Sequence, residues 1–310
     1  ESGVDIMRIF DALNDIDNMK SSIRFVQEAG GWADCAVCYT VDPKFSRRER
    51  LSARLHGKKL PGEIFGVPYF VEKAKELVEL GADMISIKDM AGLIDPFTAN
   101  ALVRALKSEV EVPIDLHTHC TPGYGVASVL AAMVAGVDLV DTVLLSWSGG
   151  PAAPAYEIVQ LFADRLGLET GVDRGAAAQI DRELRAIRVE LSAFDQYKVL
   201  PPELDLGADK NGELPPEVIA LFDGAIDATV ARKFDASLEL CQRIEAYFNY
   251  PKPNEIVKRA QIPGGMYSNF KNQLAKDGKS DYMDRALEAV QEVRSKAGWV
   301  PLVTPTSQIV

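Results

Sequence analysis

The chain contains little cysteine and histidine, has no long hydrophobic run and carries no excess of basic charge. Among its 310 residues are four cysteines and three histidines. Four cysteines are too few for a disulfide framework in a chain of this length, so we expect a reducing, cytoplasmic location. No apolar run approaches about 18 residues, which excludes a spanning helix. The N-terminus shows no signal-peptide pattern, so secretion is disfavoured.

The charge balance is acidic, with 45 Asp and Glu residues against 34 Lys and Arg residues and a formal net charge of -11. A field of that sign repels phosphate backbones, so we expect no nucleic-acid partner. At 47%, the hydrophobic content is that of an ordinary globular chain, long enough for one large domain or a barrel with an appendage.

Short apolar runs alternate with amphipathic segments in the first half of the chain. The alternation predicts a parallel sheet covered by helices. The predicted strands are 4–10, 33–40, 82–89, 112–119 and 137–145, and the predicted helices between them include 17–29, 68–80, 96–108 and 123–135. One step departs from the rhythm, because the basic, irregular segment 43–66 predicts a solvated helix and loop at one end of the sheet.

From residue 151 onward the pattern is helical. The expected helices are 155–166, 174–197, 214–231, 233–248, 254–260 and 281–296, with turn-rich segments at 261–270 and 298–310. Five strand–helix units cannot close a barrel, which needs eight. We therefore expect a partial barrel over 1–150, a helical domain over 151–310, and about three strand–helix units missing upstream at the same spacing.

The strongest local signal is His117-Thr118-His119 at the end of a predicted strand. Residues two apart on a strand point to the same face, so both imidazoles project into one site. That site lies at the carboxyl ends of the strands, where α/β folds place their chemistry. A pair of hydrogen-bonded core histidines is the alternative interpretation.

Lys88 ends the preceding strand and can approach the two histidines across neighbouring strands. It could form a salt bridge or anchor a phosphate, or react when desolvated; if it took up CO₂, the carbamate would offer metal ligands beside the imidazoles. On the first strand, Asp11 could face the site and orient a substrate. Asn14 and Asp15, which follow it, could equally cap the next helix.

Two further patterns favour plain structural roles. Pro263-Gly264-Gly265-Met266-Tyr267-Ser268-Asn269 has the composition of a tight turn followed by a hydroxyl. Cys35 and Cys38 have redox spacing, but inside a strand their sulfurs face opposite sides, so buried structural cysteines are favoured.

Taken together, these motifs resemble the carboxyltransferase domain of biotin-dependent enzymes, which include pyruvate carboxylase, the oxaloacetate decarboxylase α subunit and the large transcarboxylase subunit. The matching pieces keep their order and spacing along nearly the whole chain. They are RIFDALND (8–15), CYTVDP (38–43), IKDMAGL (87–93), DLHTHCTPG (115–123), VDLVDT (137–142), QIPGGMYSN (261–269) and PLVTPTSQIV (301–310).

The resemblance implies a (β/α)8 TIM-type barrel, entered here at its fourth strand, and a helical domain that folds back over the barrel mouth. Lys88, as a carbamate, would join His117 and His119 in binding a divalent ion such as Zn, Mn or Co, which would act as a Lewis acid. The Ser268 hydroxyl would move a proton between the oxo acid and biotin. Met90 would line the substrate pocket.

The resemblance also implies what this chain does not supply. The fourth metal ligand, an aspartate, and the substrate-clamping arginine of the family lie on strands that precede this sequence, so we expect the fragment alone to be incomplete. Biotin would arrive on a carrier domain outside the chain, with biotin carboxylase or decarboxylase subunits as partners. A homodimer is the expected oligomer.

The predicted function is carboxyl transfer between carboxybiotin and a 2-oxo acid, most simply pyruvate or oxaloacetate, in either direction. A metal-dependent aldolase or Claisen-type lyase of the same barrel superfamily is one alternative, because it also uses a His-x-His pair. A non-catalytic scaffold subunit is the other. A test of whether the activity requires biotin separates the carboxyltransferase from the aldolase or lyase.

Overall fold

The structure is a computed structural model that describes residues 3–43, 45, 47–57, 60, 62–195, 197, 199–209, 213–303 and 306. Its centre is a sheet of five parallel strands that follow one another in chain order. They are β1 (Ile6–Phe10), β2 (Trp32–Cys38), β3 (Met84–Lys88), β4 (Ile114–His117) and β5 (Leu139–Val140). The predicted α/β fold with a parallel sheet is confirmed.

The fifth strand is much shorter than the predicted run 137–145. The backbone NH of Asp141 still donates to the carbonyl of Leu116, but the chain then leaves the sheet. Val143 pairs instead with Ala155 in an isolated bridge, and a short 3-10 turn, η1 (Leu145–Trp147), follows. Competition from this second pairing explains why the apolar run does not continue as a strand.

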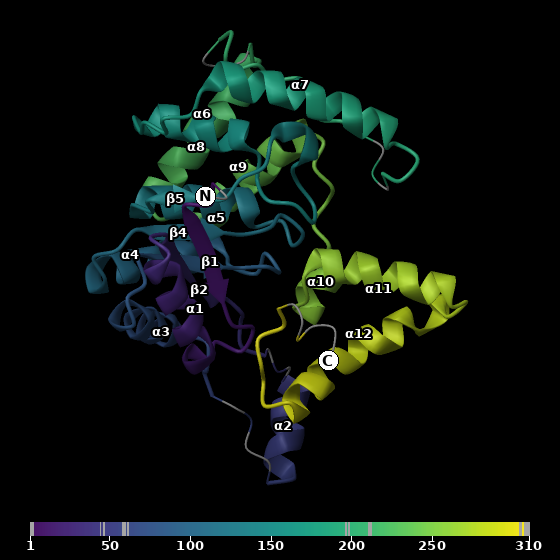
Figure 1. Ribbon diagram of the computed structural model, residues 1–310. Helices are drawn as coiled ribbons and strands as arrows, with labels where there is room; N and C mark the ends of the chain where they lie inside the picture. Colours follow the sequence, from purple (N-terminus) through teal and green to yellow (C-terminus); the bar gives the residue numbers. More distant parts are fainter. Residues whose placement is uncertain are drawn as a thin grey trace.

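Four helices pack against one face of the sheet, as the alternation predicts (Figure 1). They are α1 (Ile16–Glu28), α3 (Val67–Glu79), α4 (Pro96–Glu109) and α5 (Gly125–Ala135). Asp15 caps α1 by accepting from the NH of Asp17, so its predicted capping role is confirmed. Asp95 caps α4 in the same way, ahead of a proline that suits the first helical turn.

The insertion between β2 and α3 contains helix α2 (Arg47–Leu55), which confirms the expected solvated helix within 43–66. It projects from the body of the molecule at the bottom of Figure 1. Leu51 and Leu55 are exposed on it.

Helices dominate the second half of the chain. A lobe contains η1, α6 (Tyr156–Leu166), α7 (Arg174–Glu190), α8 (Pro216–Val230) and α9 (Phe234–Tyr247). Its apolar core is formed by η1, α6, α8 and α9 with part of α5, and α7 packs on η1. The lobe lies at the top of Figure 1, together with part of α5. Helix α7 ends at Glu190 rather than at the predicted residue 197; turns follow at 191–194.

The last segment forms what we call the arm, residues 254–303. It contains α10 (Glu255–Ala260), α11 (Gly264–Lys276), the short turn η2 (Ser280–Tyr282) and α12 (Met283–Lys296). The prediction of a turn-rich segment at 261–270 is wrong from Gly264 onward, because a helix starts there, with Pro263 at its N-cap position. Pro263, Gly264 and Gly265 interrupt the preceding helix as expected, but they stand at the start of the next helix rather than in a loop. The residues 304, 305 and 307–310 of the expected turn-rich tail lie outside the described residues.

Across the described residues, no helix is long and apolar enough to cross a membrane.

Candidate functional site

The face of the sheet opposite the helices carries an ionic network centred on Arg8 of β1. Its guanidinium Nε lies 2.5 Å from Asp34 and one Nη lies 2.6 Å from Asp115. The other Nη binds Asp141, which follows β5. The Ser86 hydroxyl lies 2.7 Å from a carboxylate oxygen of Asp34 and 2.9 Å from one of Asp115, so it bridges these two carboxylates. One arginine therefore ties together carboxylates from β2, from β4 and from the residue that follows β5.

The two predicted histidines lie directly beyond this network, at the carboxyl end of β4. Nε2 of His117 is 3.1 Å from Nε2 of His119. The other ring nitrogen of each faces an acceptor: Nδ1 of His117 is 2.8 Å from Asp141, and Nδ1 of His119 is 2.7 Å from the carbonyl of Pro151. Since a carbonyl and a carboxylate only accept, each Nδ1 carries a hydrogen, and the two Nε2 atoms face each other.

This arrangement fits one shared divalent ion. Two nitrogens bound at about 2.0–2.1 Å to the same ion stand roughly 3 Å apart, which is the separation of the two Nε2 atoms. Burial, together with the proximity of His117, lowers the pKa of His119 to about 4, so the ring is neutral and able to ligate near pH 7. The same 3.1 Å separation also suits a hydrogen bond between the two rings, so the assignment of the pair to a metal site stays a prediction.

Lys88 is brought to the same place by strand register. It pairs with His117 across β3 and β4, and its Nζ lies 4.8 Å from the ring centre of Phe10 on β1. Burial and then the positive charge of Arg8 lower the pKa of its amine. Met90 follows at the end of the strand and is half-buried.

Asp11 is held by the turn that follows β1. One carboxylate oxygen accepts from the NH groups of Leu13 and Asp15, and the other accepts from Asn18 at 3.1 Å. These bonds lower the pKa of Asp11 against the opposing effect of its partial burial. Asn14 is buried and bonds the backbone of Cys38 on the next strand. The predicted role of Asp11 in orienting a substrate stays a prediction.

Ser268 lies in the second turn of α11, and its hydroxyl donates to the carbonyl of Gly264 at 3.2 Å. The first turn of that helix packs on Thr121, two residues beyond His119. The structure thus brings the arm to the end of β4. The expected proton-transfer role of Ser268 stays a prediction.

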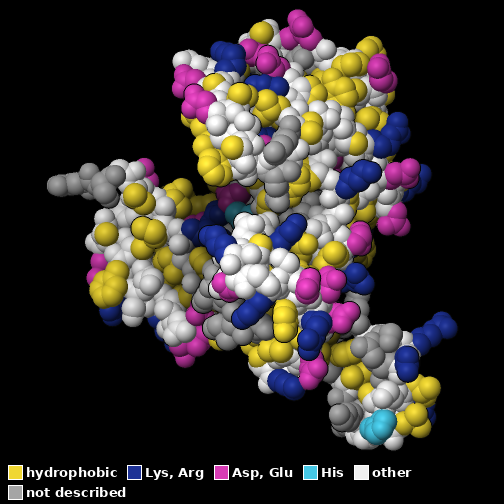
Figure 2. Space-filling model, turned by 90° about the vertical axis from the view of Figure 1, so that its right-hand side faces the viewer, with side chains coloured by type: hydrophobic (Ala, Val, Ile, Leu, Met, Phe, Trp, Pro, Cys, Tyr) yellow, Lys and Arg dark blue, Asp and Glu magenta, His cyan; other side chains and the backbone are white. Residues whose placement is uncertain are grey.

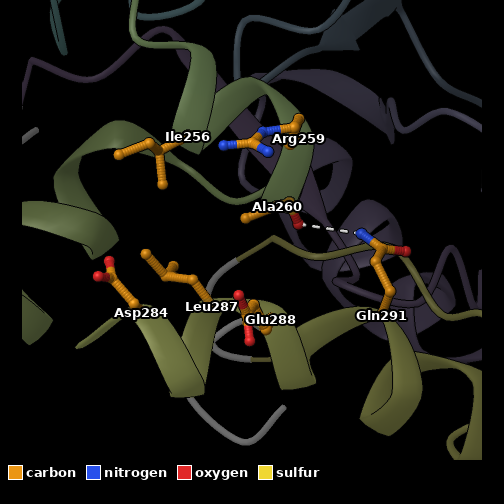
Figure 3. A pocket seen from close by; sticks show the side chains of 7 residues that line it. All are labelled: Ile256, Arg259, Ala260, Asp284, Leu287, Glu288 and Gln291. Atoms are coloured by element: carbon orange, nitrogen blue, oxygen red, sulfur yellow. Dashed lines mark hydrogen bonds between the residues drawn. The ribbon is translucent and has the colours of Figure 1, made fainter. Parts of the chain in front are cut away.

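Near the middle of the space-filling view, acidic, basic and histidine side chains meet in a hollow of the molecule (Figure 2). Two other cavities lie elsewhere. A groove of about 440 Å³ runs between α10 and α12, where Gln291 donates to the carbonyl of Ala260 (Figure 3). Arg259 lines its α10 side, and Asp284 and Glu288 line its α12 side. A cavity of about 740 Å³ lies between the arm and the loops that precede α3, α4 and α5. Neither is lined by the predicted ligands.

The four cysteines are buried and unpaired. Burial raises the pKa of Cys35 and of Cys38 to about 12, so neither is a reactive thiolate near neutral pH. The structural interpretation of this pair agrees with these surroundings.

Sequence reasoning missed Arg8 and Asp141, although both stand inside motifs that carry the resemblance. Burial alone would raise the pKa of Asp141, but hydrogen bonds from His117 and Arg8 lower it to about 2. Asp141 is therefore a fixed anion behind one imidazole. The available signal was the presence of charged residues, Arg8, Asp34 and Asp115, at inward positions of otherwise apolar strands.

Two known protein families match separate parts of the chain. The family model described as "Conserved carboxylase domain" matches residues 257–310, and the model described as "HMGL-like" matches residues 66–182. The second match includes Lys88 and both histidines, and the first includes Ser268.

Relatives match along the whole chain. A pyruvate carboxylase subunit of Methanocaldococcus jannaschii is 31% identical over 310 residues, which are 100% of this chain and 42% of that protein. The methylmalonyl-CoA carboxyltransferase 5S subunit of Propionibacterium freudenreichii is 31% identical over 312 residues, covering 100% of this chain and 47% of that subunit. The chain resembles the carboxyltransferase domain of biotin-dependent enzymes.

A solved structure supports the same family. The carboxyl transferase domain from Rhizobium etli pyruvate carboxylase superposes with a TM-score of 0.61 and 26% identity, covering 99% of this chain and 40% of that chain. The resemblance to the biotin-dependent carboxyltransferases that the motifs indicated is therefore confirmed. The chain spans less than half the length of the curated relatives it matches here.

Proposed function

We propose that this chain carries the core of a metal-dependent carboxyltransferase that moves a carboxyl group between carboxybiotin and a 2-oxo acid, pyruvate or oxaloacetate. The observation that carries the proposal is the pair of Nε2 atoms 3.1 Å apart, each ring oriented by a separate acceptor, at the carboxyl end of a parallel strand. The relatives, which are named as pyruvate carboxylase and carboxyltransferase subunits, support this chemistry.

His117, His119 and Lys88 are the residues that would hold the ion, Zn, Mn or Co. For Lys88 to ligate, its neutral amine must add to CO₂, forming a nitrogen–carbon bond and releasing a proton. The ion would supply Lewis acidity near the oxo acid. Asp141 and the carbonyl of Pro151 keep each imidazole in the tautomer that can ligate.

Ser268 is the proposed proton-transfer residue. Its Oγ already donates to a backbone carbonyl, which leaves its lone pairs available to accept a proton. In the proposed reaction this oxygen exchanges a proton between the methyl carbon of the oxo acid and the biotin ring nitrogen. Met90 and Asp11 are the proposed pocket residues.

We infer further that the sheet is part of a barrel, represented from its fourth strand, with a partial barrel over 1–150 and a helical domain over 151–310 that folds back over the mouth. Biotin would be delivered by a carrier domain outside this chain, with a biotin carboxylase or a decarboxylase subunit as partner. A dimer and a cytoplasmic location complete the proposal. The strand order and the position of the arm beside the strand ends support it (Figure 1).

The decisive experiment measures divalent metal per chain in the complete protein and in its Lys88→Ala and His117→Ala variants, purified in CO₂-replete buffer. We expect bound metal in the wild type and its loss in both variants. His56→Ala is the matched control, because His56 is an exposed histidine that bonds only the carbonyl of Ser52 among the contacts described. Its metal content should equal that of the wild type.

Activity separates the proposed reaction from its alternatives. The complete protein should decarboxylate oxaloacetate only when biotin is present. Bound metal with an activity that ignores biotin would favour the aldolase or lyase interpretation. If neither the wild type nor any variant binds metal, and none of them is active, the result would favour a non-catalytic scaffold subunit.

A further inference from the structure

The helix that carries Ser268 begins unusually close to the loop beyond the histidine pair. Gly264, the first residue of α11, is buried against the side chain of Thr121. A methyl group at Gly264 would stand 2.9 Å from Cγ2 and 3.1 Å from Cβ of Thr121, and closer still to its Oγ1. Real carbon–carbon contacts of this kind are longer, so only glycine lets the helix come this near.

Thr121 cannot easily move out of the way. Its hydroxyl donates to the carbonyl of Gly150 at 3.1 Å, and its own carbonyl accepts the NH of Asn254 at 2.9 Å. The same Gly150–Ala152 loop holds His119, through the carbonyl of Pro151. Thr121 is thus fixed to the loop that orients a proposed ligand and, at the same time, to the residue that caps α10.

Gly264 also acts directly on Ser268, because its carbonyl is the acceptor of the Ser268 hydroxyl. Ser268 stands four residues along the helix, about 6 Å of helical rise from this contact. A shift of the helix start would therefore carry the hydroxyl and its acceptor together. The contact therefore fixes the start of the helix on which that oxygen is carried.

We propose that Gly264 and Thr121 form a close-packed joint that positions the Ser268 hydroxyl relative to the histidine pair. Both are positioning residues, and neither touches the reacting atoms. The inference rests on the proposed function for the role of Ser268. The geometry of the joint itself is independent of it.

The neighbouring glycine provides a matched control. Gly265 follows in the same helical turn, and nothing lies within 4 Å of a methyl group placed on it. Neither glycine has a positive φ, so alanine suits the backbone at both positions. Differences between Gly264→Ala and Gly265→Ala therefore report the contact with Thr121 and not helix propensity.

The experiment measures biotin-dependent decarboxylation of oxaloacetate by the complete protein and by the two variants. We expect Gly264→Ala to lower kcat roughly 10- to 100-fold, as displacements of about 1 Å do, with KM for oxaloacetate little changed. Gly265→Ala should stay within about twofold of the wild type. Metal content should be the same in all three, because the histidines keep their acceptors.

A second substitution tests the cause. Thr121→Ala removes both Oγ1 and Cγ2, the atoms that a methyl at Gly264 would meet most closely. The double variant should recover most of the kcat lost in Gly264→Ala. Amide hydrogen exchange in residues 264–276 should rise in Gly264→Ala and fall again in the double variant, whether or not the protein is active.

Two results overturn the proposal. Gly264→Ala could match Gly265→Ala in both kcat and exchange, or the double variant could remain as impaired as the single one. If the wild type shows no biotin-dependent activity, the proposed function fails instead. The exchange comparison then still decides whether the joint exists.

Discussion

Nε2 of His117 lies 3.1 Å from Nε2 of His119, while Asp141 accepts from the opposite side of the first ring at 2.8 Å. The carboxylate fixes the tautomer and would make the imidazole a stronger ligand for the proposed ion. We expect Asp141→Asn to weaken divalent metal binding roughly 10- to 100-fold without removing it. Equilibrium titration with Zn²⁺ against a competing chelator measures this change.

The control for that titration is Asp223→Asn, which changes a carboxylate paired with Arg165 in the upper lobe. Its Zn²⁺ affinity should equal that of the wild type. An Asp141→Asn protein with unchanged affinity would show that the carboxylate does not support the histidine.

Arg8 should contribute strongly to stability, because removing it leaves Asp34 and Asp115 buried with less compensating charge. Breaking such a buried network typically costs about 3–5 kcal/mol. We expect Arg8→Met to lower the free energy of unfolding by an amount near that range. Urea denaturation measures it, with the slope of the transition compared between variants.

An exposed ion pair gives the reference value. Arg182 binds Asp205 at 2.9 Å, with both side chains exposed to solvent. Arg182→Met should therefore cost less than about 1 kcal/mol. If Arg8→Met and Arg182→Met lower the free energy of unfolding equally, the network around Arg8 contributes no more to stability than an exposed ion pair does.

Local patterns were enough to find the sheet and to place Lys88, His117 and His119 together, whereas their proposed role as metal ligands came from the family resemblance. Lys88 and His117 end β3 and β4, and His119 follows two residues later, so the rule that parallel strands present their carboxyl ends together places all three at one edge. The capping of α1 and α4 followed from Asp15 and Asp95 in the same local way.

What the sequence did not reveal depends on residues far apart in the chain. Arg8 meets a carboxylate 133 positions away, and no local pattern encodes that pairing. The glycines before Ser268 suggest a turn because their composition is that of turns. In the structure these glycines are helical, and Gly264 packs on Thr121. That contact joins residues far apart in the chain, so no local pattern predicts it.

Glu157 gives a prediction for pH. It lies in the first turn of α6, is 3% exposed, and neither carboxylate oxygen has a well-placed hydrogen-bond donor among the described residues. Burial, with the charge of Asp181 adding to it, raises its pKa to about 7. A raised pKa means that the folded state holds the proton more tightly than the unfolded state does, so stability falls as the pH rises from the unfolded pKa through about 7.

We expect Glu157→Gln to be more stable than the wild type at pH 8, with the advantage shrinking toward pH 5. The full difference corresponds to about 3 kcal/mol. Urea denaturation across this pH range measures it. Glu217→Gln, an exposed glutamate in the first turn of α8, is the control and should not change the pH profile. Parallel profiles for wild type and Glu157→Gln would contradict the prediction.

Arg294 should hold the arm to the sheet. It is fully buried in α12 and donates to the carbonyls of Val41 and Val300, to Thr40 and to Gln261. Burial lowers its pKa to about 10, yet it stays charged near neutral pH. Arg294→Met keeps the length of the side chain but leaves the carbonyls without their donor, which costs about 1–3 kcal/mol for each buried group.

We therefore expect Arg294→Met to raise amide exchange across residues 255–296 while the helices that cover the sheet keep their protection. Because Ser268 lies in this arm, kcat should fall together with that protection, while metal content remains that of the wild type. Arg285→Met is the control on the same helix, since Arg285 is exposed and packs only over Tyr282 among the contacts described. Exchange that rises equally in both variants would show that α12 is held by its apolar face and not by Arg294.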